Sequence, residues 1–173
     1  MKIVYVTGCL GFIGSYVTRK CLEHGWMVYG VDKCTYVANR SLIEEFSQYS
    51  NFTFLEEDIK NLKHLYDCDY VINTAAESHV GNSIIDSVEF ISSNIMGVRN
   101  LLDLIRNRPE NCSRRPVMFH FSTDEVYGDI EDGEHTEEHL LHPNNPYSAS
   151  KASADMLILA WARTYNIEYI ILR

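Results

Sequence analysis

Two neighbouring carboxylates follow an apolar stretch of this 173-residue chain, in the sequence FSTDEVYG at 121–128. Because like charges that close repel each other, one of the two carboxyl groups should hold its proton more tightly than usual. On a regular strand Asp124 and Glu125 would point to opposite faces of the sheet. Either they are solvated surface acids, or the strand stops at Thr123 and the following turn directs both toward one pocket.

A tyrosine and a lysine four residues apart follow in the sequence PYSASK, at positions 147 and 151. Pro146 suits the first turn of a helix, and the spacing places Tyr147 and Lys151 on one helix face. An ammonium group near a phenol favours the phenolate, so we expect the pKa of Tyr147 to fall below its usual value of about 10. Such a tyrosine can remove a proton from a sugar hydroxyl near neutral pH. The same spacing also occurs by chance on helix surfaces, so its meaning depends on the rest of the chain.

Three glycines at regular spacing, Gly8, Gly11 and Gly14, follow the first apolar run in the sequence TGCLGFIGS. The first permits a tight turn, the second lets the backbone approach a pyrophosphate, and the third lets a helix lie close to the sheet. The helix N-terminus adds free N–H groups and a partial positive charge. The spacing differs from the usual G-x-G-x-x-G, but its place between a strand and a helix predicts a dinucleotide-binding turn.

An aspartate, Asp32, ends the next apolar run. A carboxylate at this place can accept hydrogen bonds from both hydroxyls of an adenosine ribose and would repel a 2′-phosphate, which favours NAD over NADP. Lys33 follows directly and weakens that preference. Asp58, in EEDIK after the third apolar run, lies where a loop could meet the adenine, or is only a turn residue.

Short apolar runs alternate with longer helical patterns along the whole chain. Strands are expected at 2–6, 27–31, 52–55, 70–73, 117–121 and 168–172. Helices are expected at 13–24, 40–49, 61–66, 87–107 and 147–165. The acidic, proline-containing segment 128–146 is expected to be a long surface loop. The alternation is typical of a parallel sheet covered on both faces, and right-handed crossovers make it a doubly wound, Rossmann-like α/β fold.

Composition and charge argue against several classes of function. The net charge of −9, without a basic stripe, is unfavourable for nucleic acid as a partner. The longest apolar stretches are too short to span a membrane, and the N-terminus is typical of a first strand rather than a signal peptide. Five cysteines, with no C-x-x-C pair or His–Cys cluster, indicate free thiols in a reducing compartment and no metal site. We therefore expect a cytoplasmic protein with one domain.

Together these motifs resemble those of the extended short-chain dehydrogenase/reductase superfamily, and within it the nucleotide-sugar 4,6-dehydratases of the dTDP-glucose 4,6-dehydratase type. The resemblance covers nearly all 173 residues and rests on TGCLGFIGS, VDKCTY, AAESHV, SNIMGVRNLL, STDEVYGD and NPYSASKASADML. The glycine turn and the Tyr–Lys pair are shared across the superfamily, whereas TDEVYG is specific, since related epimerases generally lack the acid pair. The resemblance implies an NAD-dependent lyase of deoxysugar biosynthesis that converts dTDP-glucose or UDP-glucose to the 4-keto-6-deoxy sugar and water.

The resemblance also implies the catalytic roles of five residues. Tyr147 would deprotonate the glucose 4-hydroxyl, with Thr123 as a hydrogen-bond partner, while the C4 hydride passes to NAD. Glu125 would then take the C5 proton and Asp124 would protonate the departing 6-hydroxyl, before hydride returns to C6. Lys151 would tune Tyr147 and hold the nicotinamide ribose. The two acids thus need opposite protonation states, which their mutual repulsion promotes.

For the cofactor the resemblance implies contacts from several strand ends. The first turn would cover the pyrophosphate, and the residues after the second and third strands would hold the adenosine ribose and the adenine edge. The segment after the fourth strand, with one serine from the helix at 87–107, would line the nicotinamide side. The implied cofactor residues are Gly8, Gly11, Phe12, Ile13, Gly14, Asp32, Lys33, Cys34, Thr35, Asp58, Ile59, Thr74, Ala75, Ala76, Glu77, Ser78, Ser93, Tyr147 and Lys151. Ser78 and Thr123 would also lie near the nucleotide sugar.

The chain departs from the family pattern in two places. Gly81 and Asn82 stand where the family commonly has an acid and a base, so an ion pair there is lost, with an effect on substrate contacts or a nearby loop. The chain also stops at Arg173, on a strand, where the family continues into most of the sugar-nucleotide domain. We therefore expect residues 1–173 to be the NAD-binding domain of a truncated protein that binds NAD but turns over little or no substrate. The resemblance further implies a homodimer formed through the helices at 87–107 and 147–165, although packing on the sheet explains their apolar faces equally well.

Two other functions remain open from the sequence. A nucleotide-sugar 4-epimerase would use the same Tyr–Lys pair, and a non-catalytic NAD-binding module would need neither the pair nor the acids. Asp124 and Glu125 favour the dehydratase over both. The sequence does not distinguish dTDP from UDP, because the residues that contact the base would lie mostly beyond position 173.

Overall fold

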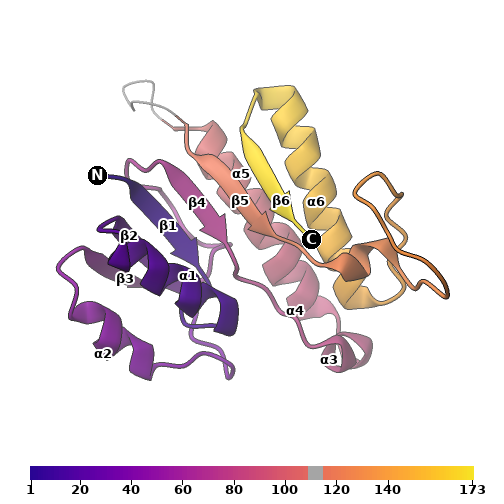
Figure 1. Ribbon diagram of the computed structural model, residues 1–173, viewed down its shortest axis with the longest axis horizontal. Helices are drawn as coiled ribbons and strands as arrows, with labels where there is room; N and C mark the ends of the chain where they lie inside the picture. The colour runs from indigo at the N-terminus through magenta and orange to yellow at the C-terminus, as the bar shows by residue number, and fades with distance from the viewer. Residues whose placement is uncertain (109–114) are drawn as a thin grey trace.

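A six-stranded parallel sheet forms the centre of the computed structural model, which describes residues 1–108 and 115–173 (Figure 1). Its strands stand in the order β3-β2-β1-β4-β5-β6, and every neighbouring pair is parallel. The strands are β1 (Ile3–Thr7), β2 (Met27–Asp32), β3 (Phe52–Glu56), β4 (Tyr70–Asn73), β5 (Val117–Phe121) and β6 (Tyr169–Leu172). The expected doubly wound, Rossmann-like fold is confirmed.

Helices cover both faces of the sheet (Figure 1). The helical elements are α1 (Phe12–Glu23), α2 (Ser41–Ser47), α3 (Val80–Ile85), α4 (Val88–Phe90), the π-helix η1 (Ile91–Gly97), α5 (Val98–Arg106), the 3₁₀-helix η2 (Asp124–Tyr127) and α6 (Pro146–Tyr165). Successive side chains of β1 point to opposite faces. Val4 and Val6 join the core under α1 and α2, while Tyr5 joins the core under α5 and α6.

The sheet changes its winding direction between β1 and β4. From β1 the chain moves outward to β2 and β3, and it then returns to β4 and moves the other way to β5 and β6. The carboxyl ends of parallel strands at such a switch point leave a crevice in which α/β proteins bind ligands. The fold therefore places the glycine turn after β1, the aspartate after β2 and the acid pair after β5 along one edge of the sheet.

Most expected elements are present with ends shifted by at most two residues, but two of the expected helices differ in the structure. The helix expected at 61–66 is not formed: Leu62 is buried in the core, and Asn100 on α5 donates to the carbonyl groups of Ile59 and Leu62 at 2.8 and 2.9 Å. The helix expected at 87–107 is wound as a π-helix in its middle. Strand β5 spans the expected residues 117–121, and the short helix α3 was not expected.

Candidate active site

The turn between β1 and α1 is closely packed around two glycines. Gly8 has a φ of +71°, which favours glycine, and a Cβ there would lie 2.8 Å from backbone atoms of Ala75. A Cβ on Gly14 would overlap the carbonyl oxygen of Gly8 and lie 2.6 Å from Thr74 Oγ1. Gly11 caps α1 without a side-chain hydrogen bond, and the first turn of α1 has no acidic residue. The free N–H groups at this helix end are therefore available to an anion.

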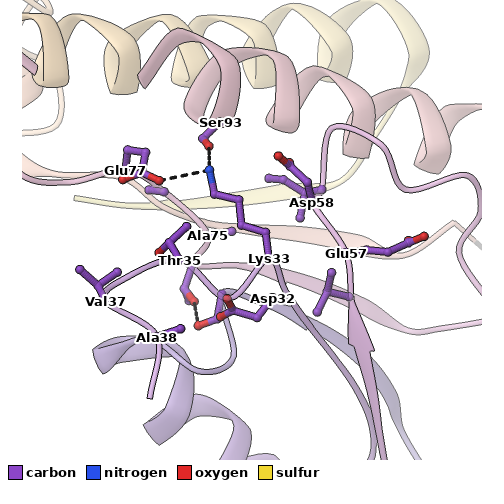
Figure 2. Close-up of a pocket in the computed structure, with 16 residues that line it drawn as sticks. Asp32, Lys33, Thr35, Val37, Ala38, Glu57, Asp58, Ala75, Glu77 and Ser93 are labelled. Carbon is purple, nitrogen blue, oxygen red and sulfur yellow. Dashed lines mark hydrogen bonds and ion pairs between the residues drawn. The ribbon is translucent and has the colours of Figure 1, made fainter. Parts of the chain in front are cut away.

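A pocket that is partly open to solvent lies at the carboxyl ends of the strands (Figure 2). Many of its lining residues were expected to contact a cofactor: Gly8, Gly11, Asp32, Lys33, Thr35, Asp58, Ile59, Thr74, Ala75, Ala76, Glu77 and Ser93. Four more line it that the sequence reasoning missed: Val31, Val37, Ala38 and Glu57. Val37 and Ala38 follow Thr35 directly, so the apolar pair after VDKCTY was the available signal.

Several other expected cofactor residues lie outside the lining of this pocket. Phe12 is 83% exposed, Ile13 is also exposed, and neither residue lines this pocket. Gly14 acts through packing, as described above. Cys34 adopts a positive φ of 56° and donates its N–H to Asp32, and Ser78 lies in the segment between β4 and α3.

The carboxylate of Asp32 is fixed by two backbone groups. One oxygen accepts from Leu10 N at 3.0 Å and the other from Cys34 N at 2.8 Å. The residue is 9% exposed and lines the pocket. Because each carboxylate oxygen has a second lone pair, Asp32 keeps acceptor capacity for ligand hydroxyl groups.

The side chain of Lys33 crosses the pocket from the end of β2 to the opposite wall (Figure 2). Its ammonium group donates to Ser93 Oγ at 2.7 Å and pairs with the carboxylates of Glu77 at 3.1 Å and Glu89 at 3.6 Å. The sequence suggested that Lys33 weakens the preference against a 2′-phosphate. In the structure its charge is already paired with acids on the far side of the pocket.

The segment after β4 is held by a residue that the sequence reasoning missed. Asn94, buried in the π-helix, donates to the carbonyl oxygen of Glu77 and accepts from its N–H, both at 2.9 Å, and donates to Ser150 Oγ on α6 at 2.8 Å. The neighbouring Ser93 lines the pocket. A π-helical turn is rare and often marks a functional site, and here it supplies both residues. The polar pair within the apolar stripe of SNIMG was the available signal.

The acid pair lies on the 3₁₀-helix that directly follows β5. Thr123 caps this helix, its Oγ1 accepting from Glu125 N at 3.3 Å, and Asp124 is exposed. Glu125 is half-buried and accepts from Asn145 Nδ2 at 3.1 Å. Asn145 also forms the capping box of α6, so one residue fixes both the acid and the helix that begins beside it.

Tyr147, in the first turn of α6, lies close to this acid pair. Burial raises the pKa of Tyr147, and Glu125 and Asp124 raise it further, whereas a hydrogen bond with Thr123 lowers it. The expected fall in the Tyr147 pKa is therefore wrong for the chain without ligands. Lys151 does not counter the effect, because its buried ammonium group donates to the carbonyl oxygen of Phe121 at 2.6 Å. The structure thus brings the phenol and both acids together and holds the lysine against β5.

The remaining expectations concern cysteines, metals, membranes and the departure at 81–82. Cys9, Cys21, Cys34 and Cys68 are free, and Cys112 lies outside the described residues. Within 1–108 and 115–173, no group of three or more His, Cys, Asp or Glu side chains is placed to hold a metal ion. No helix in those ranges has the length and apolar character needed to cross a bilayer. Asn82 donates to Tyr36 Oη at 3.1 Å, so α3 contacts the loop after β2.

Comparison with known proteins gives consistent matches over the whole chain. The family model for GDP-mannose 4,6 dehydratase matches residues 5–173. The dTDP-glucose 4,6-dehydratase of Haemophilus influenzae is 39% identical over 99% of this chain and 54% of its own length. The chain spans about half the length of the curated relatives it matches.

Solved structures show the same arrangement. A dTDP-glucose 4,6-dehydratase from Streptomyces venezuelae with NAD bound has a TM-score of 0.89 and 34% identity, over 98% of this chain and 54% of the other. A UDP-glucuronic acid 4-epimerase from Bacillus cereus, solved with UDP-glucuronic acid and NAD, has a TM-score of 0.88 and 31% identity, over 100% of this chain and 56% of the other. Dehydratases and epimerases thus share this half of the fold.

Proposed function

The chain belongs to the GDP-mannose 4,6 dehydratase family of extended short-chain dehydrogenase/reductase proteins, and from this premise we propose that it is the NAD-binding half of a nucleotide-sugar 4,6-dehydratase. The proposed substrate is dTDP-glucose, or UDP-glucose, and the products are the 4-keto-6-deoxy sugar and water. The observation that carries the proposal is the pair Asp124 and Glu125 on a 3₁₀-helix beside the buried phenol of Tyr147. The relatives at 38–40% identity include several dTDP-glucose 4,6-dehydratases.

The pocket and the glycine turn fit NAD. The uncapped N-terminus of α1 suits a pyrophosphate. Gly14 packs closely against Gly8 and Thr74, which keeps this N-terminus beside the carboxyl ends of β1 and β4. Asp32, fixed by two N–H groups, suits the adenosine ribose hydroxyls. When bound, NAD would supply a positively charged nicotinamide ring that accepts a hydride and, once reduced, can return it.

Different residues of the chain would then carry out the separate proton transfers. Tyr147 takes the proton of the sugar 4-hydroxyl, and the Thr123 hydroxyl bonds the phenol. Once C4 is a ketone, the C5 proton is acidic and Glu125 removes it, while Asp124 protonates the 6-hydroxyl that leaves as water. Because burial keeps Tyr147 protonated in the free chain, positive charge in the loaded site is needed to lower its pKa. Lys151, whose ammonium group is held at the carbonyl oxygen of Phe121, does not supply that charge in the free chain.

The test uses the chain extended to the full length of its relatives. Incubation with dTDP-glucose and with UDP-glucose is expected to release a 4-keto sugar from one of them, detected by mass spectrometry as the loss of one water. A 4-epimer without loss of water would instead support the epimerase, and unchanged sugar with bound NAD would support a binding module. For residues 1–173 alone we expect NAD binding and little or no turnover. Multiple-turnover release of product would contradict the proposal that these residues are only the NAD-binding half of the enzyme.

The pocket predicts a preference for NAD over NADP in residues 1–173. The Asp32 carboxylate would repel a 2′-phosphate, and Lys33, paired with Glu77, is not free to offset it. We expect NAD to bind at least about tenfold more tightly than NADP, about 1.4 kcal/mol, as measured by isothermal titration calorimetry. Asp32→Asn should narrow the difference, and Asp58→Asn, in the same pocket, should leave it unchanged. Equal affinities in the unaltered chain would contradict this assignment of Asp32.

We also propose that two copies of the protein pair through the helices α4–η1–α5 and α6. Ile91, Met96 and Met156 on these helices remain about half exposed although their neighbours are buried in the core. Exposed apolar side chains on adjacent helices support an interface.

A further inference from the structure

A row of polar side chains crosses the sheet beside the candidate active site. Thr7, Asn73 and His120 occupy paired register positions on β1, β4 and β5, so they lie on one face. Each is at most 1% exposed. Thr7 Oγ1 donates to Asn73 Oδ1 at 2.6 Å, and Asn73 Nδ2 lies 3.0 Å from His120 Nδ1. Because buried polar groups are costly unless they are bonded, the row must connect to something at its far end.

The row ends at two buried side chains one turn apart on α6. Lys151 Nζ donates to the carbonyl oxygen of Phe121 at 2.6 Å and lies 3.4 Å from His120 Nε2. Asp155 Oδ1 lies 3.8 Å from the same ring nitrogen. The other oxygen of Asp155 accepts from Arg173 Nε at 2.9 Å. His120 therefore stands between the cofactor turn and the lysine of the Tyr–Lys pair.

We propose that His120 is a positioning residue for Lys151, holding its ammonium group through the lone pair on Nε2. An ammonium group can only donate, so the contact is attractive when Nε2 is unprotonated and Nδ1 carries the ring proton. This arrangement turns the Asn73 amide over from the orientation described above, so that Nδ1–H donates to its side-chain oxygen and its amino group donates to Thr7 Oγ1. Such amide orientations are assigned from the hydrogen-bond network. Phe121 and His120 fix two of the three donors of Lys151, which leaves the third for a ligand hydroxyl.

The charges around the lysine agree with a neutral, accepting ring. Burial holds the pKa of His120 well below its ordinary value, and the Lys151 ammonium acts in the same direction. Burial also lowers the pKa of Lys151 to about 8, which Asp155 on its own helix opposes. Asp155 is itself bonded to Ser122 and Arg173. The pKa of Lys151 is already below its usual value, so the loss of the neutral acceptor His120 Nε2 should lower it further.

A role of His120 in catalysis, through Lys151, rests on the proposed function, but its role in positioning Lys151 does not. Thr7 directly precedes Gly8, so the row ties the dinucleotide turn to the lysine. The tests below use neither NAD nor sugar, so they can fail while the dehydratase proposal stands, and the reverse is also true.

The first test measures the tautomer of His120 directly. In residues 1–173 carrying ¹⁵N-labelled histidine, NMR should show a proton on Nδ1 and none on Nε2 for His120 at pH 7, assigned by the signals lost in His120→Gln. These signals should not titrate down to pH 5. A proton on Nε2 would overturn the proposal, because Lys151 would then face a second donor.

The second test follows the titration of Lys151 through stability. Between pH 8 and about 10.4 the unfolded chain binds more protons at Lys151 than the folded chain does. The contribution of Lys151 to the free energy of unfolding therefore rises with pH in this range. Lys151→Met should remove this rise. His120→Phe keeps an aromatic ring of similar volume but has no nitrogen atoms. It should move the onset of the rise in stability about one pH unit lower, which is a tenfold change in the acid dissociation constant of Lys151. His120→Gln, which can accept at the Nε2 position, should keep the onset near pH 8.

The comparison of the two His120 variants decides the outcome. A purely structural role would lower the stability of both variants at every pH without moving the onset, and that result would overturn the proposal. Equal shifts in His120→Phe and His120→Gln would overturn it as well. Should His120→Phe fail to fold, the tautomer measured in the unaltered chain still decides.

Discussion

Gly14→Ala is expected to destabilise the protein by more than about 3 kcal/mol, beyond the usual cost of overpacking a core. The new Cβ would overlap the carbonyl oxygen of Gly8 and lie 2.7 Å from the Gly8 carbonyl carbon. Both atoms belong to the backbone of the turn, so no side chain can move aside. Helix α1 would have to shift away from β1, and we also expect NAD binding to be lost. Urea denaturation followed by circular dichroism measures the first effect, and calorimetry measures the second.

Gly11→Ala is the matched control in the same turn. A Cβ on Gly11 would lie 3.3 Å from the carbonyl oxygen of Gly8, and the backbone of Gly11 is in an extended conformation that alanine adopts. We expect a loss below about 1 kcal/mol, the usual effect at a helix N-cap. Similar losses of stability in the two variants would show that the turn is not held by the close approach of Gly14.

The doubly wound fold class and the glycine turn could be predicted because local signals indicate them. Each apolar run is short and is followed by a turn or a helix, and strand–helix alternation leaves few topologies. The helix expected at 61–66 failed for a tertiary reason. Leu62 and Leu65 pack on the core, and Asn100, far along the chain, donates to the carbonyl groups of Ile59 and Leu62.

Many residues predicted from the sequence line one pocket, but the electrostatics around Tyr147 could not be predicted. The spacing of Tyr147 and Lys151 correctly places them on one helix, but burial depends on the packing of the whole fold, and it raises the pKa of the phenol. The partners of Lys151 on β5 and of Lys33 on the π-helix are 30 and 60 residues away in sequence. No local pattern specifies such contacts or the π-helical winding.

Glu125→Gln is expected to reduce the exchange of the sugar C5 proton with solvent by about 10²- to 10⁴-fold, the usual contribution of a general base. Glutamine keeps the shape of the side chain and its oxygen can still accept from Asn145 Nδ2, so the capped start of α6 should remain intact. The measurement is deuterium incorporation at C5 by mass spectrometry, in the protein extended to the length of its relatives and supplied with nucleotide sugar in D₂O. Glu131→Gln, an exposed acid in the following loop, is the control and should exchange at the rate of the unaltered protein. An epimerase of the same family has no need of a base at C5, so wild-type exchange in Glu125→Gln would remove the argument for a dehydratase.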